Sequence, residues 1–461
     1  MSDVRSRTYV RPSAVSGTRW APLLSLETGS GSTPYGTAPH PHFFSGFLTA
    51  SQATADGLLA VADVARTRYL GGASSRAGYA LDPVVTGHDD RLRFESLSPC
   101  RGVYARLDLL GDGVNGARIQ RGTSYVDVNA ALLGDLGRIS SRHPLRLSVG
   151  PIPPRETTEP GGQHVRKQNR LSQRRLEGFG DAQVLASGLD LRAEVPRARG
   201  QHLVRSLARL GQPGLWALPV SGDVRLMTVP SQGAVSVPDA GRLAALQLVV
   251  AHMTALRLYA PPDATDATDA TDDANTASVW EAVLPGMRLT VVPLRSRQNH
   301  FSGESAAAEA TGIEQIRQDA ELLSVLLAWE ARIDPAALAE QAGLTLTRTR
   351  AALAWLSAEG RCGYDTAEAA HFHRELPFHV RKAGTDHPRL VAARALVEAG
   401  AVTLDQGSGT ATVVSRGTAH QVRDVLRRRA CTCSWWSRHR GSRGLCEHAL
   451  AAVVAQRQGH A

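Results

Sequence analysis

The sequence contains few cysteines, few aromatic residues and no long apolar run. Its five cysteines among 461 residues are too few for a scaffold held together by disulfides. Nowhere do about 18 uncharged apolar residues follow one another, as a membrane-spanning helix requires. The stretch from Met1 to Pro12 is polar and lacks the apolar segment of a secretory signal. We therefore expect a cytoplasmic protein without a membrane partner.

The motifs of several large enzyme classes are also missing. The chain has no Gly-x-x-x-x-Gly-Lys-Ser/Thr phosphate loop, no His-Glu-x-x-His metalloprotease motif and no Gly-x-Ser-x-Gly nucleophile elbow. An active site assembled from distant residues would leave no such trace in the sequence. From the sequence alone we expect a protein that is not an enzyme.

The composition is that of a folded, basic protein. Apolar residues make up 43% of the chain, enough to bury sizeable cores in the roughly three or four domains that its length suggests. A formal net charge of +9 and an isoelectric point near 9.7 favour acidic partners. Abundant arginine and alanine with little lysine is equally typical of a GC-rich genome. The total charge therefore identifies no partner by itself.

The first 300 residues predict two α+β domains. Apolar residues recur at helical spacing from Ser51 to Tyr69, and Arg91 to Ser96 and Val103 to Leu109 alternate as strands do. Together with a short helix after Asn129, these patterns predict an N-terminal α+β domain over residues 1–150.

A second α+β domain is expected over residues 151–300. Pro151 to Arg175 is rich in Pro, Gly and Arg without periodicity, which predicts an exposed linker at the boundary. Helical and strand-like patterns then alternate up to Val292. Within this range, Asp263 to Ser278 repeats Ala-Thr-Asp three times and has no large apolar side chain, which predicts a disordered segment.

Residues 311–382 have the order of elements of a winged helix. An apolar helix from Ile316 to Trp329 is followed by Asp334-Pro335, a helix start, and by Gly343, a helix stop. A third helix and a β-hairpin complete the order helix, helix, helix, hairpin. The exposed face of the third helix offers only Arg348, Arg350 and threonines. Either DNA contact or a packing module fits this, and the packing module is favoured.

His371, His373 and Glu375 alternate along the expected second hairpin strand, on one face. Such residues can bind a metal or exchange protons. Because no further ligand is identifiable nearby in the sequence, a surface or structural role is favoured over a metal site.

The sharpest chemical signal lies near the C-terminus, where a Cys-x-Cys pair and a Cys-x-His pair are separated by twelve residues: Cys431, Cys433, Cys446 and His448. Three thiolates and one imidazole close the tetrahedron of Zn²⁺ and leave no position for water or substrate, so the site is structural. This hypothesis is preferred over chance cysteines, a disulfide or an iron–sulfur site. Cys100 and Cys362 stand alone and are expected to be ordinary, partly buried thiols.

At these four residues the sequence resembles the SWIM zinc finger family, whose signature is Cys-x-Cys, a variable spacer and Cys-x-His. The resemblance implies a ββα framework within a C-terminal domain over residues 383–461, and Zn²⁺ held by the four residues named above. In that family the module is regarded as a binder of DNA or of proteins.

A looser resemblance involves three phrases that look like actinobacterial SWIM finger proteins: Arg93 to Leu110, Arg121 to Asn129 and Phe372 to Phe378. Proteins of that type tend to be encoded beside MoxR-type AAA+ ATPases and proteins with von Willebrand A domains. By analogy, the resemblance implies an adaptor in such a system.

Basic and aromatic residues surround the expected zinc site and form a candidate binding surface for nucleic acid or a protein partner: Arg427, Arg428, Arg429, Trp435, Trp436, Arg438, Arg440 and Arg443. Three thiolates and Zn²⁺ carry one net negative charge, which needs far fewer arginines for neutralisation. The alternative is that a tryptophan packs on the metal site and the arginines only balance charge.

Together, these observations predict an α+β multidomain protein with a winged-helix-like module and a C-terminal ββα SWIM finger. Its expected role is that of a zinc-binding adaptor or scaffold for a protein partner. The alternative is a DNA-binding regulator that uses the winged helix and the arginine-rich surface.

Overall fold

The structure is a computed structural model, and the residues it describes are 4–18, 20–70, 73–76, 81–151, 165–170, 173–210, 213–261, 277–294, 313–327, 329–377, 388–405, 410–425, 428–439 and 445–459. They belong to two compact units. The first unit comprises residues 1–298 and 375–378, and the second comprises residues 299–374 and 379–461. All but the last two residues of the expected disordered segment, 263–278, lie outside the described residues.

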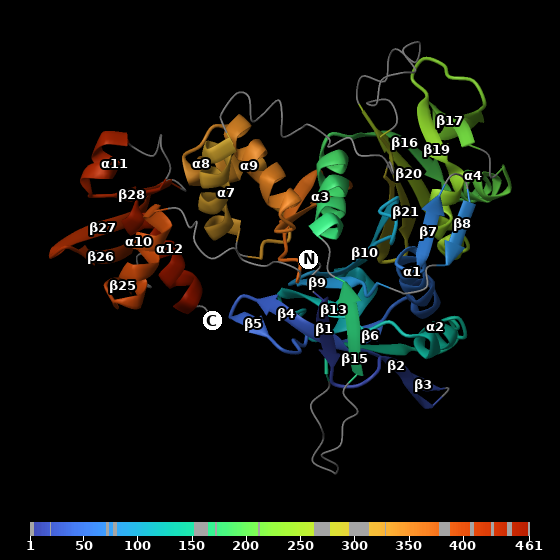
Figure 1. Cartoon of the computed structure of the whole chain (residues 1–461), viewed down its shortest axis with the longest axis horizontal. Coiled ribbons are helices and arrows are strands. Elements are labelled where there is room, and N and C mark those ends of the chain that lie inside the picture. The colour runs from blue at the N-terminus through green and yellow to red at the C-terminus, as the bar shows by residue number, and fades with distance from the viewer. Residues whose placement is uncertain are drawn as a thin grey trace. The chain divides into compact units, whose positions relative to one another are not determined.

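A ten-stranded antiparallel sheet runs through the first unit (Figure 1). Strands from both sides of residue 150 belong to it, where the sequence led us to expect separate domains. Alternating apolar residues reveal the faces of a strand but not its partner, so the pairing of Val103 with Pro293 leaves no local trace. In spatial order the strands are β16 (Asp190–Pro196), β20 (Ala255–Ala260), β21 (Val279–Leu284), β22 (Met287–Pro293), β11 (Val103–Leu110), β10 (Arg91–Leu97), β9 (Val84–His88), β13 (Gly122–Val126), β4 (Thr28–Thr33) and β5 (Gly36–Ala38).

Smaller sheets accompany it. A five-stranded sheet contains β12 (Val114–Gly116), β6 (Phe44–Leu48), β14 (Leu145–Val149), β3 (Ala21–Leu26) and β2 (Ala14–Thr18). A three-stranded sheet contains β18 (Asp223–Met227), β17 (Pro213–Val220) and β19 (Val235–Asp239). Two-stranded pairs are formed by β1 (Val4–Tyr9) with β15 (Val165–Arg170) and by β7 (Thr67–Leu70) with β8 (Ala73–Arg76).

The helices of the first unit cover these sheets. They are α1 (Ser51–Val64), α2 (Ala130–Leu136), α3 (Gln173–Ser187), α4 (Arg197–Leu210) and α5 (Ala245–Val249), with short 3-10 turns at η1 (Gly111–Gly113) and η2 (Ala240–Leu243). None of the described helices of the chain is long and apolar enough to cross a membrane. The helix expected from Ser51 to Tyr69 is present as α1 but ends at Val64, because Thr67–Leu70 forms strand β7. The short helix after Asn129 is confirmed as α2, which the Asn129 side chain caps by accepting the Leu132 N–H.

One face of the ten-stranded sheet is apolar and packs on α1. Phe94 and Leu107, a cross-strand pair on β10 and β11, are fully buried there. Gly57 allows α1 to approach closely, because a Cβ atom at this position would lie 2.8 Å from the Leu107 Cδ1 atom. This helix-on-sheet contact forms the centre of the apolar core of the first unit.

The opposite face of β10 and β11 is buried as well, although it carries charges. Arg93 donates to Asp108 across the two strands at 3.1 Å, and Arg106 donates to the same carboxylate at 3.0 Å. Tyr104 donates its hydroxyl proton to Glu95 at 2.6 Å. Buried charges are tolerated only when paired and hydrogen-bonded, and these contacts, two across the strands and one within β11, provide the pairing.

The prediction of an exposed linker from Pro151 to Arg175 was wrong for the described residues of this range. Val165–Arg170 is strand β15, paired antiparallel with β1, and α3 begins at Gln173. The strand sequence Val-Arg-Lys-Gln-Asn-Arg has no apolar alternation. Its extended conformation rests on main-chain hydrogen bonds to β1, which sequence periodicity does not report.

The second unit begins with three helices and a hairpin, in the expected order. They are α7 (Ile313–Leu327), α8 (Pro335–Ala342), α9 (Leu346–Ala358), β23 (Cys362–Asp365) and β24 (Ala370–His373). Asp334 caps α8, Gly343 ends it in the left-handed conformation at φ 66°, and Thr345 caps α9. The winged-helix assignment itself stays a prediction.

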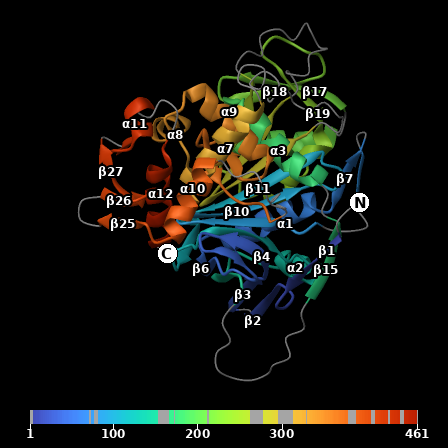
Figure 2. The same cartoon turned by 60° about the vertical axis from the view of Figure 1, so that its left-hand side comes forward.

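The rest of the second unit is a four-stranded antiparallel sheet with helices, broader than the expected ββα framework. Its elements are α10 (Pro388–Glu398), β25 (Val402–Asp405), β26 (Thr410–Ser415), β27 (Thr418–Val425), β28 (Arg428–Cys431), α11 (Ser434–His439) and α12 (Glu447–Gly459). Helix α12 packs against all four strands and against α10 (Figure 2). Residues of α7 and α9 share one apolar cluster with Val413 and Leu450, so the expected domains 311–382 and 383–461 have a common core.

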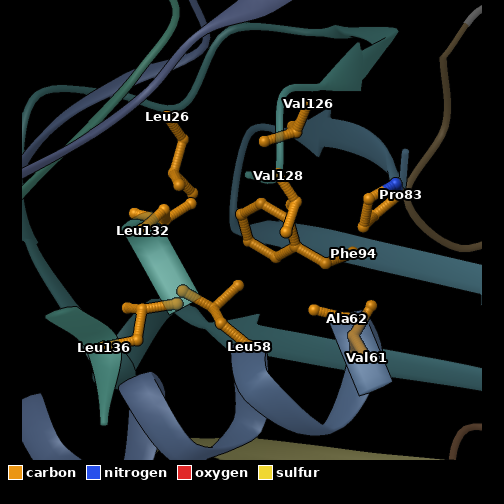
Figure 3. Close-up of a pocket in the computed structure, with 10 residues that line it drawn as sticks. All are labelled: Leu26, Leu58, Val61, Ala62, Pro83, Phe94, Val126, Val128, Leu132 and Leu136. Carbon is orange, nitrogen blue, oxygen red and sulfur yellow. The ribbon is translucent and has the colours of Figure 1, made fainter. Parts of the chain in front are cut away.

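A small cavity of about 20 Å³ lies in the core of the first unit between α1, α2 and the sheets (Figure 3). Every side chain that lines it is apolar: Leu26, Leu58, Val61, Ala62, Pro83, Phe94, Val126, Val128, Leu132 and Leu136. A water molecule there would lack hydrogen-bond partners, and a substrate would find no reactive group. The cavity is a packing defect rather than a binding site.

Leu132→Ala should therefore destabilise the first unit, because it enlarges an existing cavity whose walls cannot collapse freely. We expect a loss of about 2–5 kcal/mol in the free energy of unfolding. Hydrogen exchange of the β10 and β11 amides, measured across a urea series, gives the free energy of unfolding of this unit. Leu191→Ala is the control, since this side chain is 50% exposed and should cost less than about 0.5 kcal/mol. Equal losses in the two variants would contradict the assignment.

Candidate metal centre

The four predicted ligands converge on one point in the second unit. Cys431 ends β28, Cys433 and Cys446 directly precede α11 and α12, and His448 lies in the first turn of α12. Their ligand atoms all lie within 4.8 Å of one another, and all four side chains are buried. In a tetrahedral site with Zn–S distances of about 2.3 Å, sulfur atoms lie roughly 3.8 Å apart. A slight contraction would bring the cluster to zinc geometry.

The Cys-x-Cys turn is held by its neighbouring strand. Cys431 pairs with Val422 on β27. One residue on, the Thr432 N–H donates to the Gln421 carbonyl at 3.1 Å, and the Gln421 N–H donates to the Thr432 hydroxyl at 3.0 Å. These reciprocal bonds extend the strand pairing into the turn and fix the direction of both cysteine side chains.

Cys433 and Cys446 occupy equivalent positions at the starts of two helices. The Trp436 N–H points to the Cys433 sulfur at 3.4 Å, and the Ala449 N–H points to the Cys446 sulfur at 3.4 Å. Each donor lies three residues after its cysteine, as in a helix N-cap. Amide donors at this position stabilise a thiolate over a thiol, which is the form that binds a metal.

The His448 imidazole is buried, and neither of its ring nitrogens has a hydrogen-bond partner among the described residues. The nearest carboxylate oxygen, on Glu447, is 3.6 Å from Nε2, which is too far for a hydrogen bond. A buried polar group without a partner is costly, and a metal ion would satisfy one of these nitrogens. The ring also lies against the His420 ring, with centroids 4.0 Å apart. Sequence reasoning did not single out His420, because its strand pattern does not show that it faces α12.

Without a metal ion, the thiols of this cluster resist ionisation. Burial raises the pKa of Cys433. The hydrogen bond with Cys431, followed by burial, raises the pKa of Cys446 to about 12. A divalent cation reverses this preference by pairing directly with the thiolates. The donor set, the burial and the unpartnered imidazole together fit a closed Cys₃His site that can hold one zinc ion.

Other predicted residues near the metal centre are described only in part. Trp435 and Trp436 lie on α11, half-buried against the apolar cluster of the second unit. The backbone of Arg428 and Arg429 belongs to β28, and that of Arg438 to α11. The side chains of these three residues, and the whole of Arg427, Arg440 and Arg443, lie outside the described part of the chain. The arginine-rich surface therefore stays a prediction.

The third helix of the winged-helix-like region presents less charge than its sequence suggests. Arg348 makes a bidentate ion pair with Asp319 on α7, at 2.8 and 2.6 Å. This pairing raises the pKa of Arg348 and ties α9 to α7. Of the two arginines expected on the outer face, Arg350 remains exposed.

The histidines of the hairpin are structural in their surroundings. His371 and His373 are buried, and the Trp329 N–H donates to His373 Nδ1 at 3.0 Å. Burial lowers the pKa of His371 to about 4. Among the described residues, the C-terminal cluster is the one group that brings three or more metal-binding side chains together, so these histidines and Glu375 do not join in a metal site.

The two isolated cysteines lie apart from the metal centre. Cys362 is fully buried, and burial raises the pKa of its thiol to about 12. Cys100 is half-buried and accepts the Tyr69 N–H at 3.1 Å. Both are free thiols.

Comparison with known proteins does not identify a family. No family model and no curated protein matches the chain. Two solved structures align weakly: Proliferating Cellular Nuclear Antigen from Entamoeba histolytica and a chain of the PCNA2-PCNA3 complex from Sulfolobus tokodaii. The first is 8% identical and covers 55% of this chain and 98% of its own, with a TM-score of 0.32. The second is 7% identical and covers 55% and 100%, with a TM-score of 0.32. Likenesses this weak support no conclusion about this chain.

The purified protein should contain about one zinc ion per chain, and Cys433→Ser or His448→Ala should lower that content. Because metal binding is coupled to folding at such sites, both variants should also lose hydrogen-exchange protection in β26, β27 and α12. Elemental analysis and hydrogen-exchange mass spectrometry test the two effects. Cys362→Ala removes a buried thiol of the same unit outside the cluster and should keep full zinc. Full zinc in the ligand variants would exclude this site.

Zinc affinity should rise steeply with pH. The raised pKa values of Cys433 and Cys446 mean that both thiols carry protons at neutral pH before zinc binds, so binding must displace these protons. Because all three cysteines must bind as thiolates, the logarithm of the apparent association constant should increase by at least about two per pH unit between pH 6 and 8. Competition with a chromophoric chelator, corrected for its own titration, measures the slope. An affinity independent of pH would contradict protonated thiols in the metal-free cluster.

Proposed function

We propose that this protein is a zinc-dependent binding or scaffold protein and not an enzyme. On this proposal its C-terminal module is a SWIM-type zinc finger that acts as an adaptor for a protein partner. The observation that carries the proposal is the convergence of Cys431, Cys433, Cys446 and His448 within 4.8 Å. Four protein ligands saturate a tetrahedral zinc ion, so the ion would organise a surface rather than activate water.

The surface that the metal would organise begins at α11. This helix follows Cys433 directly and carries Trp435 and Trp436, which are half-buried rather than fully packed. Tryptophans that keep part of their surface exposed are typical anchors of protein interfaces. The arginines at 427–429, 438, 440 and 443, which neighbour these tryptophans in the sequence, would supply charge for an acidic partner.

The resemblance to actinobacterial SWIM finger proteins suggests what the partner is. We propose a component of a MoxR-type AAA+ ATPase and von Willebrand A system. This step rests on analogy, and the residues of the metal centre do not select among protein partners.

A DNA-binding regulator is the second candidate. It is favoured by the order of α7, α8, α9 and the hairpin, and by Ile333, which bridges to His371 as the first strand of a wing does. The ion pair between Arg348 and Asp319 argues against it, because it occupies one of the two arginines of the candidate recognition helix. Arg350 alone provides little base recognition.

The two candidates respond differently to substitution on the zinc module. For a protein adaptor, Trp435→Ala or Trp436→Ala should weaken partner binding more than the triple change Arg427→Gln, Arg428→Gln and Arg429→Gln. For a regulator, the triple change should flatten the dependence of log affinity on log salt by two to three units, at roughly 0.9 per lost phosphate contact. Binding to a labelled duplex and to the partner captured from the native cell is measured on all variants.

The control is Trp20→Ala, since Trp20 is 64% exposed in the first unit and should not affect either ligand. Zinc content must stay at one ion per chain in every variant. Weaker binding then results from lost contacts with the ligand and not from unfolding of the zinc module. If the arginine changes weaken the partner more than the tryptophan changes do, the adaptor surface at α11 is wrong. If the protein binds duplex DNA more weakly than roughly 10⁻⁴ M at physiological salt, the regulator is wrong.

A further inference from the structure

Helix α4 of the first unit has an uncompensated basic face. Its sequence, Arg-Ala-Arg-Gly-Gln-His-Leu-Val-Arg-Ser-Leu-Ala-Arg-Leu, contains four arginines and a histidine but no acidic residue. The apolar side chains Leu203, Val204 and Leu207 are buried, and the helix packs against strands β16 and β20. All four arginines are exposed. The helix is thus fixed to the sheet by one face and presents positive charge on the other.

The charges lie close together and are poorly paired. Arg205 and Arg209 are one turn apart, roughly 6 Å between their Cβ atoms, on the side opposite the buried residues. Neither they nor Arg197 has an ion-pair partner among the described residues. Arg199 reaches Asp223 at 3.9 Å, but both side chains are largely exposed, so this pair contributes little.

This distribution is electrostatically unfavourable for the protein alone. Two arginines four residues apart repel each other. Arg197 and Arg199 lie in the first turn, where the positive end of the helix dipole disfavours cations and where no acidic residue compensates. A solvent-exposed helix face normally mixes both signs of charge. An anionic partner would relieve both sources of repulsion.

From this geometry we propose that the exposed face of α4 binds the phosphate backbone of duplex nucleic acid, independently of base sequence. Arginine forks match phosphate oxygens in geometry and charge. The face carries no aromatic or large apolar side chain, so it lacks the anchor that a protein interface requires. The apolar face is already buried in the core, so the helix cannot insert into a lipid surface.

The proposal concerns the first unit and is independent of the zinc module. It is tested on the full-length protein with Arg205→Gln/Arg209→Gln, using a fluorescein-labelled duplex of mixed sequence and fluorescence anisotropy over a salt series. Two lost phosphate contacts should reduce the slope of log affinity against log salt by about 1.8 and weaken binding roughly 30-fold at 0.15 M salt. Arg205→Lys/Arg209→Lys keeps both charges and should retain most of the affinity.

The control Arg118→Gln/Arg138→Gln removes two exposed arginines of the same unit that have acidic partners, Asp89 and Asp135. It should leave duplex binding unchanged. The proposal is overturned if Arg205→Gln/Arg209→Gln binds the duplex like the wild type, or if the control loses as much. The proposal is also overturned if the full-length protein binds poly-L-glutamate through Arg205 and Arg209 but does not bind the duplex, since the partner is then an acidic protein. These variants keep Arg427, Arg428 and Arg429, so failure here is distinct from failure of the regulator.

Discussion

The end of β28 and the starts of α11 and α12 meet at three sulfur atoms and one imidazole, and the C-terminal part of the second unit depends on this contact. β28 has four residues and α11 has six. Elements this short do not persist alone, because the cost of nucleating a helix or ordering a strand exceeds what a few hydrogen bonds return. The apolar cluster of this unit includes Ala449, Ala451 and Ala452 of α12 beside larger side chains such as Leu445 and Leu450. A metal ion at this point would join the three short elements directly and add to the energy that the core supplies.

The first unit does not depend on a metal ion to hold short elements together, because its elements are joined by one long sheet. The middle strands β9, β10 and β11 of its long sheet are buried on both faces, which places ion pairs such as Arg93 with Asp108 where a smaller domain would expose them to water. Such pairs rarely add net stability, since desolvation offsets most of their attraction. They do penalise any shift of strand register, because a slip of one residue would leave a buried charge without its partner. The charged face thus specifies the pairing of β10 with β11.

Local signals in the sequence predicted many of the elements and the four residues that form the C-terminal cluster, because each signal depends on neighbouring residues. Asp334 starts α8 by capping it with its side chain, and Gly343 ends α8 with its left-handed backbone. The Cys-x-Cys spacing likewise requires only a local turn. The extent of the central sheet was not predictable, because β11 pairs with β22, a strand that lies far from it in the sequence. The ion pair between Arg348 and Asp319 was not predictable either, because residues on two helices come into contact only after the helices pack. Strand β15 was missed for the same reason.

The two basic regions differ in what positive charge does there. For the arginines near the metal ligands in the sequence, a small part of the charge has a structural reason, because three thiolates and Zn²⁺ leave one net negative charge to balance. Helix α4 has no such reason, since its buried side chains Leu203, Val204 and Leu207 are aliphatic. Selection for stability alone would place an acidic residue in its first turn and at one of its exposed positions. Arginine at these positions costs folding energy and is better explained by a ligand, so the exposed charge of α4 is the stronger indication of a polyanion partner.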